Sequence, residues 1–255
     1  MNENLQLLAD LLFRPSRAAA RLGDPASGWL LPAGLSVLGT LASALLLTHA
    51  PAEYLAAANG GAEPPAARTF AFLLALGLAG EVCFTLFFAA LVCAFASALS
   101  SGRLALRLPL VLLGPAAYGF FYLLPLQGPA FAAAKWLLAA GAAAFAAYSA
   151  RRAGSRYLHA AKIMLSLSVL TVLTAAAAWG CVLAGSPGAY ANTQLAAALI
   201  SLFYLVRYTS AFSGLSGARA AVAAIGGLGG GAAFLYSLKY LGLISDAAFQ
   251  ALMMT

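Results

Sequence analysis

Long runs of apolar residues alternate with short polar segments along the chain. An α-helix rises about 1.5 Å per residue, so roughly 20 apolar residues cross the ~30 Å hydrocarbon core of a bilayer. Seven runs are long enough: residues 29–50, 69–100, 108–126, 129–150, 163–184, 193–213 and 220–244. They are continuous and rich in the helix formers Ala and Leu, whereas membrane β-strands are short and alternate in polarity. The pattern predicts an all-α polytopic membrane protein, a bundle of about seven transmembrane helices.

Two of these runs depart from a simple perpendicular crossing. Residues 69–100 are longer than one crossing needs, which predicts a tilted helix or one that extends beyond the bilayer on one side. Residues 108–126 contain Pro109, Pro115 and Pro125. Because proline removes a helical hydrogen bond and kinks the backbone, a broken or re-entrant segment is the alternative to a full crossing here.

The composition excludes other classes of protein. Only 8% of the 255 residues are charged, against about 25% in globular proteins, and 63% are hydrophobic. So few charges cannot form the polar surface of a soluble enzyme or a DNA-binding module. The formal net charge of +7 is therefore interpreted as a topology signal, and no nucleic-acid partner is expected.

Basic residues are distributed unevenly between the polar segments. With a cytoplasmic N-terminus, the cytoplasmic side carries ten of them: Arg14, Arg17, Arg21, Arg103, Arg107, Arg151, Arg152, Arg156, Lys162 and Arg219. The loops of the opposite side carry only Arg68. Short cytoplasmic loops retain the positive charge in membrane proteins. The asymmetry requires residues 108–126 to cross, so it predicts seven spans with the N-terminus in and the C-terminus out.

Residues 1–28 are expected to be a separate cytoplasmic segment, and residues 29–255 a single transmembrane domain. The first part has no apolar core followed by a small-residue cleavage site, so it is not a secretory signal. Arg14, Arg17 and Arg21 recur every three or four residues, which places them on one face of a helix. We expect an amphipathic segment in the membrane interface, where each cation near anionic lipid contributes ~1 kcal/mol. The alternative is that these cations only set the topology.

Four ionisable residues fall inside the predicted spans, at different depths. Arg207 and Lys239 are near span ends, where long side chains reach the interface. Glu81 is twelve residues from the expected outer end at Thr69, about 18 Å deep. A carboxylate at that depth costs several kcal/mol unless it is neutral, hydrated or paired. Glu81, with Lys135 as a possible partner, is therefore the candidate intramembrane polar site.

The pairing of Glu81 with Lys135 requires the second and fourth spans to be neighbours. The competing interpretation is a protonated Glu81 that donates a hydrogen bond to a hydroxyl or backbone group of another helix. The first arrangement suits proton or ion coupling, and the second is structural.

Catalytic and cofactor motifs are not found. Residues 214–217, Gly-Leu-Ser-Gly, have the form of an intramembrane serine-protease motif, but both histidines, His49 and His159, precede it. Metalloprotease and nucleotide-binding motifs are absent from the sequence. The cysteines all fall inside spans, without metal-binding spacing: Cys83, Cys93 and Cys181. We expect no enzyme activity, no catalytic residues, no metal and no cofactor.

Two short patterns concern helix packing. The tetrapeptide Leu-Ser-Val-Leu occurs at residues 35–38 and again at 167–170, a faint sign of internal duplication of the kind found in transporters. The last span has two small-xxx-small pairs, Gly226 with Gly230 and Gly227 with Gly231. Such pairs allow close helix packing inside the chain, homo-oligomerisation or a hinge, and internal packing is the preferred interpretation.

Two further stretches carry a family resemblance. Residues 11–22, with Phe13-Arg14-Pro15 and then Arg21-Leu22, resemble the entry of prokaryotic Yip1-domain membrane proteins. Residues 101–107, followed by Tyr118 and Leu124-Pro125, resemble that family's loop and its proline-bearing third helix. The resemblance covers roughly residues 5 to 150.

The resemblance implies a non-enzymatic protein of a prokaryotic cell membrane. Eukaryotic Yip1 relatives bind Rab-type GTPases and usually have five spans; this chain has seven predicted spans and lacks their acidic, Gly-Pro-rich cytoplasmic segment. The expected role is a scaffold or adaptor that binds anionic lipid, another membrane protein or a second copy. Its expected binding face comprises Arg14, Arg17, Arg21, Arg103, Arg107, Arg151, Arg152 and Arg156. The alternative is a small transporter or channel with Glu81 as its coupling group.

Overall fold

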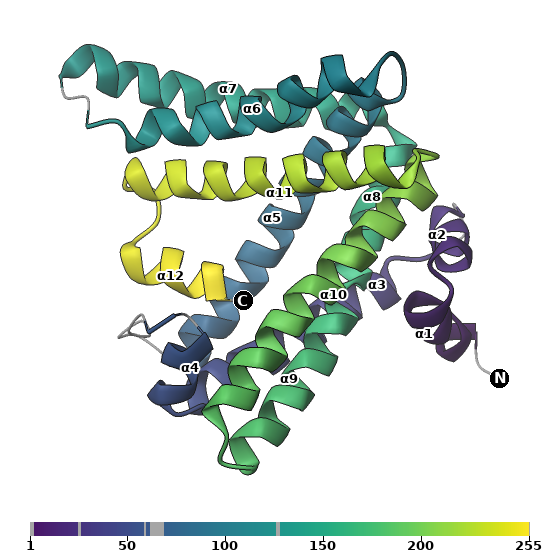
Figure 1. Ribbon diagram of the computed structural model, residues 1–255, viewed down its shortest axis with the longest axis vertical. Coiled ribbons are helices and arrows are strands. Elements are labelled where there is room, and N and C mark those ends of the chain that lie inside the picture. Colours follow the sequence, from purple (N-terminus) through teal and green to yellow (C-terminus); the bar gives the residue numbers. More distant parts are fainter. Residues whose placement is uncertain (1–2, 25–26, 59, 62–68, 126–127, 255) are drawn as a thin grey trace.

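The computed structural model describes residues 3–24, 27–58, 60–61, 69–125 and 128–254 (Figure 1). These residues form helices and no strand: α1 Glu3–Phe13, α2 Pro15–Gly23, α3 Leu30–His49, α4 Ala52–Ala58, α5 Phe70–Leu99, α6 Leu104–Leu123, α7 Pro129–Ala153, α8 Ser155–Ser166, α9 Ser168–Leu183, α10 Pro187–Ser213, α11 Gly217–Tyr240 and α12 Asp246–Met254. Within them, seven segments are long and apolar enough to cross a membrane: α3, α5, α6, α7, α8 with α9, α10, and α11. The predicted all-helical class is confirmed, and so is the presence, among these residues, of seven helices long and apolar enough to span a membrane.

The proline-rich third span is one continuous helix. α6 runs through both Pro109 and Pro115 without a break, so the broken or re-entrant segment considered from the sequence is not formed. Proline is tolerated in membrane helices because neighbouring helices, side chains and small local adjustments satisfy the backbone groups that it frees. The fifth predicted span is divided into α8 and α9 at Leu167, where the helix is only locally distorted: the Leu167 backbone stays in the right-handed helical region and its N–H still bonds the Ile163 carbonyl.

Other helix limits also differ from the apolar runs. α8 begins at Ser155 rather than at residue 163, and α10 begins at Pro187 rather than at residue 193. The short helices α4 and α12 lie outside the predicted spans. Helices extend through polar residues because each further residue adds a backbone hydrogen bond, which hydropathy alone does not register.

α5 is the central helix of the structure. Its N-terminal half packs against α3 and α12, and its C-terminal half packs against α7, α8 and α11 and, over a smaller area, α6. In Figure 1, α6 packs along α11 and α7 runs in a similar direction in this view, whereas α9 and α10 diverge from them, and the two groups meet at the end where α1 and α2 lie.

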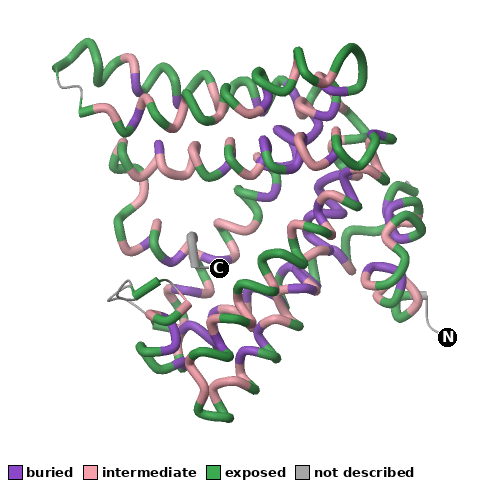
Figure 2. Tube along the Cα trace, in the orientation of Figure 1, coloured by how far each residue is buried: buried purple, intermediate pink, exposed green. Residues whose placement is uncertain are grey.

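Apolar side chains remain on the outer surface of the helices. Figure 2 shows α6 and α7 exposed along most of their length. Leu110 and Leu113 on α6 and Leu137 on α7 are each more than 60% exposed. Exposed apolar area on this scale is typical of a surface that lipid covers.

The segments that carry most of the basic residues lie together at one end. In Figure 1 the α5–α6, α7–α8 and α10–α11 connections all lie at the end occupied by α1 and α2. We call this the basic end. The gathering agrees with the expected orientation, which itself stays a prediction. Arg68, the single cation expected on the opposite side, lies outside the described residues.

The expected amphipathic segment is two short helices, α1 and α2, which pack on α8 and α10. Leu11, Ala18 and Leu22 are fully buried in a cluster with Ile163 and Tyr208. The Tyr208 hydroxyl donates a 2.8 Å hydrogen bond to the Leu11 carbonyl. The apolar side of the segment is therefore covered by the protein itself, and its position at a lipid interface stays a prediction.

Candidate functional site

Glu81 is held by hydroxyl groups at the crossing of α3, α5 and α9. The Ser168 hydroxyl, at the start of α9, donates a 2.7 Å hydrogen bond to Glu81 Oε1. Ser36 on α3 is a second hydrogen-bonding neighbour of the same carboxyl group. These serines are the second residues of the two Leu-Ser-Val-Leu copies, so both copies converge on one acid.

Small residues allow the three helices to approach this closely. A Cβ atom added to Gly39 on α3 would lie 2.9 Å from Ser168 Cβ and 3.0 Å from the Ser168 carbonyl oxygen. A Cβ atom added to Gly77 on α5 would lie 2.6 Å from Thr40 Cγ2. A larger side chain at either glycine would push the helices apart and draw the serine hydroxyls away from Glu81.

Lys135 is buried elsewhere, and the structure does not bring it to Glu81. Its side chain is 2% exposed, and its Nζ donates to the Tyr240 hydroxyl at 2.6 Å and lies 3.9 Å from the centroid of the same ring. The Tyr122 hydroxyl donates to the Lys135 carbonyl at 2.5 Å. Lys135 thus connects α7 to α6 and α11, and the Glu81–Lys135 pair that the sequence allows is not formed.

The other two cations of the spans also have distinct surroundings. Lys239, at the end of α11, forms a 3.0 Å ion pair with Asp246 at the start of α12 and lies 4.9 Å from the ring centroid of Phe249. Arg207 on α10 is exposed. Both are near helix ends, as the sequence predicts.

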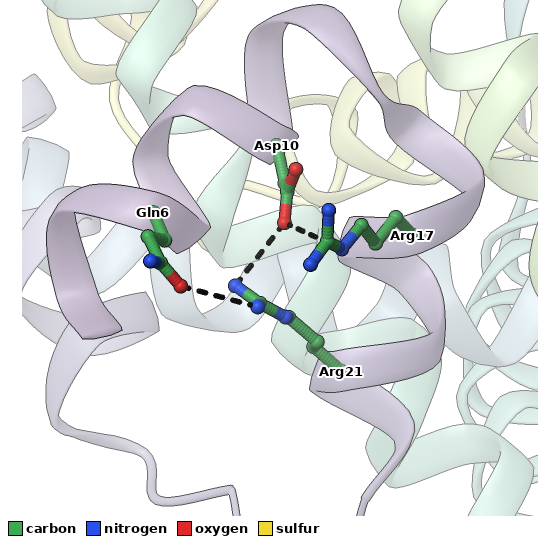
Figure 3. Close-up of polar contacts among 4 residues, drawn as sticks. All are labelled: Gln6, Asp10, Arg17 and Arg21. Atoms are coloured by element: carbon green, nitrogen blue, oxygen red, sulfur yellow. Dashed lines mark hydrogen bonds and ion pairs between the residues drawn. The ribbon is translucent and has the colours of Figure 1, made fainter. Parts of the chain in front are cut away.

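Two of the three N-terminal arginines are bound within their own segment (Figure 3). Asp10 Oδ2 lies 3.4 Å from Arg17 Nε and 3.1 Å from Arg21 Nη1. Arg21 Nη2 also donates to Gln6 Oε1 at 3.4 Å. These contacts fix α2 against α1 and offset part of the positive charge, whereas Arg14 is exposed.

Three further cations of the basic end bind backbone carbonyl groups. Lys162 is 7% exposed and donates to the Ser27 carbonyl at 2.5 Å. Arg107 donates to the Ala98 carbonyl at 2.6 Å, and Arg219 donates to the Leu99 carbonyl at 2.8 Å. The last two bonds satisfy carbonyl groups at the C-terminus of α5, where cations also complement the helix dipole. Lys162 and Arg219 are expected from the sequence only to mark topology, whereas Arg107 is expected to belong to the binding face.

The remaining arginines of the basic end are exposed. Arg103 precedes α6, Arg151 and Arg152 lie in the last turn of α7, and Arg156 lies in the first turn of α8. Within the described part of the chain, none of the four has a carboxylate partner. Four guanidinium groups therefore remain available to an anionic ligand.

A cavity of about 910 Å³ lies beside these arginines, between α5, α6 and α7, with part of α11 in its wall. We call it the α6–α7 cavity. Arg107, Arg152 and Arg156 line one part of it, and aromatic side chains such as Tyr118 and Phe234 line the rest.

A second cavity of about 460 Å³ lies between α3, α4, α9 and α10. We call it the α9–α10 cavity. Its wall includes Ser43, Thr171, Gln194 and Ser201. Thr171 is one helical turn beyond Ser168, so the cavity ends close to the serine that binds Glu81.

The glycine pairs of the last span pack inside the chain. A Cβ atom added to Gly226 would lie 2.8 Å from the Val111 carbonyl oxygen of α6. Added Cβ atoms at the other three, Gly227, Gly230 and Gly231, would lie 2.7 to 2.8 Å from side chains of α5. α11 therefore uses these positions to approach α5 and α6, which leaves them covered rather than free for a second copy.

Within the described residues no cluster of three or more His, Cys, Asp or Glu side chains could hold a metal, and the cysteines form no disulfide. Comparison of the chain with protein-family models, with curated proteins and with solved structures finds no match. The Yip1 resemblance therefore rests on its short motifs alone.

Proposed function

We propose that this protein is a non-enzymatic, Yip1-like integral protein of a prokaryotic cell membrane that acts as a scaffold or adaptor and binds anionic lipid at its basic end. The observation that carries the proposal is the state of the arginines there. Arg103, Arg151, Arg152 and Arg156 are exposed and have no carboxylate partner among the described residues, whereas their neighbours Arg107 and Arg219 bind carbonyl groups.

An exposed arginine beside a membrane attracts anionic headgroups. Each cation near an anionic leaflet contributes about 1 kcal/mol, and guanidinium groups bind phosphate with two parallel hydrogen bonds. Four such groups in one region favour lipid with a net negative charge over zwitterionic lipid. N-terminal arginines add less, because Asp10 offsets part of their charge.

Lipid binding by the purified full-length chain tests this proposal. Native mass spectrometry in detergent would compare phosphatidylglycerol with phosphatidylethanolamine of the same acyl chains, for the wild type and for R103Q/R151Q/R152Q/R156Q. We expect the wild type to prefer the anionic lipid and the quadruple variant to lose that preference. K239Q removes a cation at the C-terminal end of α11, opposite the basic end, and should keep the preference, whereas R151Q alone should weaken it. An unchanged preference in the quadruple variant would overturn the proposal.

Coupled transport through Glu81 is the second candidate function. The observation in its favour is that the hydroxyl-lined α9–α10 cavity ends at Thr171, one turn from the Ser168 hydroxyl that binds Glu81. A chain of hydroxyl groups between a cavity and a carboxyl group could carry protons. Proton flux into liposomes with an enclosed pH dye tests it. E81Q, which keeps an acceptor for the Ser168 hydroxyl, should abolish proton flux, whereas E53Q should leave it intact. Absence of proton flux in the wild type rejects this candidate.

A further inference from the structure

The α6–α7 cavity combines a cationic part with an apolar part. Arg107, Arg152 and Arg156 lie where α6 begins and α7 ends, and none of the described residues that line the cavity is acidic. The rest of the wall is formed mainly by side chains such as Phe87, Leu91, Leu110, Phe145, Tyr118 and Phe234. The cavity therefore offers separate surfaces to the two parts of an amphiphile.

The depth of the cavity matches one leaflet of a bilayer. Its lining residues on α6 extend from Arg107 to Tyr118, and those on α7 extend from Arg152 back to Ala142. At about 1.5 Å per residue, these segments are roughly 15 Å long. The hydrocarbon core of a bilayer is about 30 Å thick, so the apolar part reaches the bilayer centre while the arginines remain at the headgroup level.

The volume and the charge also suit one lipid molecule. About 910 Å³ is near the upper end of the roughly 300–1,000 Å³ range of small-molecule sites. Arg152 and Arg156 have no carboxylate partner among the described residues, and one nitrogen of Arg107 is used by the Ala98 carbonyl. Phosphate is the anionic group that guanidinium forks bind with two hydrogen bonds.

We propose that the α6–α7 cavity is a site for a single anionic phospholipid of the cytoplasmic leaflet, whose phosphate binds Arg152 and Arg156 and whose acyl chain lies between α6 and α7. The site deepens the proposed function, on which it rests, because it adds recognition of the acyl chain to attraction of the headgroup. If the arginines bound only headgroups at the surface, substitutions in the apolar wall of the cavity would not change lipid binding.

Gly114 provides a test that leaves the charge unchanged. It lines the cavity on α6, and an added Cβ atom there meets no atom within 4 Å. A phenylalanine at this position would project into the space proposed for the acyl chain. Gly141 on α7 also has nothing within 4 Å but does not line the cavity, so G141F is the matched control.

The experiment titrates the full-length protein in detergent with phosphatidylglycerol and measures the bound fraction by native mass spectrometry. R152Q/R156Q and G114F should each weaken binding about tenfold or more, as the loss of one to two good contacts predicts. G141F and K239Q should bind like the wild type. The soluble headgroup, glycerophosphoglycerol, should not displace the lipid at equal concentration.

The outcomes separate this inference from the proposed function. If R103Q/R151Q/R152Q/R156Q loses the preference for anionic lipid but G114F binds like the wild type, the basic end attracts headgroups and the cavity site is rejected. If glycerophosphoglycerol competes as well as the lipid, the ligand is a free phosphate ester and the acyl-chain site is rejected. If G114F does not fold, A142F replaces it, because its side chain fills the same space from α7. If no arginine variant changes lipid binding, both proposals fail.

Discussion

Tyr240→Phe tests whether Lys135 is bound as the structure shows. The Lys135 ammonium group is 2% exposed and donates to the Tyr240 hydroxyl at 2.6 Å. A hydrogen bond to a buried charge contributes about 1.5–3 kcal/mol, and the aromatic ring, which lies 3.9 Å from Nζ, remains in the variant. We therefore expect Y240F to lower the free energy of unfolding by about 2 kcal/mol.

A double-mutant cycle isolates this contact. K135M removes the charge, so adding Y240F to K135M should cost much less than Y240F alone, with a coupling energy of about 1–2 kcal/mol. The assay is reversible unfolding in mixed micelles, followed by far-UV circular dichroism. A coupling energy below about 0.5 kcal/mol would refute the contact, because membrane hydrogen bonds of average strength give about 0.6 kcal/mol.

The same assay distinguishes the observed partners from the pair that the sequence allows. Glu81 and Lys135 share no partner in the structure, since Ser168 binds the first and Tyr240 the second. The effects of E81Q and K135M should therefore add within about 0.3–0.5 kcal/mol. A coupling of 1 kcal/mol or more would instead support an ion pair between them.

Three further perturbations follow from local contacts. G39V should destabilise the fold by about 1–3 kcal/mol, because its side chain would overlap Ser168, whereas G229V meets no atom within 4 Å; thermal unfolding of both variants measures the difference. D10N should free α2 from α1 at a cost of about 1 kcal/mol and speed proteolysis at the N-terminus, with E53Q as the control. Y208F removes the hydrogen bond to the Leu11 carbonyl, which contributes ~1 kcal/mol, so the backbone amides of α1 should exchange hydrogen faster. Unchanged amide exchange would show that this bond does not hold α1 in place.

The number and class of the spans could be predicted from the sequence because both follow from apolar length alone. The effect of the prolines could not be predicted in the same way. Pro109 and Pro115 favour a break in α6, which is continuous, whereas a local helix distortion lies at Leu167, a residue with ordinary helix propensity. Whether a membrane helix breaks depends on how the neighbouring helices satisfy its backbone, and no local rule contains that information.

Glu81 and Lys135 were identified from their depth, but their partners were not. Partner choice depends on which helices are neighbours, and hydropathy carries no information on this point. One signal was present in the sequence: the repeated Leu-Ser-Val-Leu places Ser36 and Ser168 at equivalent positions of two spans, and both serines contact Glu81. No comparable sequence signal marks Asp10, which binds two arginines.

The contacts in the structure reduce the number of arginines that are free to bind a ligand at the basic face. Eight arginines were expected to form it, yet Arg17, Arg21 and Arg107 are already bound to groups of the protein. Arginines that bind an internal acceptor cannot be distinguished by sequence from arginines that face solvent.

The central claim is that the basic end selects anionic lipid, and the lipid retained through purification tests it most directly. The wild type and R103Q/R151Q/R152Q/R156Q would be extracted from the same membranes, and their bound lipids quantified by mass spectrometry. We predict that the wild type retains a larger anionic fraction than the bulk membrane and that the variant retains the bulk composition. Equal anionic fractions in the two preparations would contradict the claim.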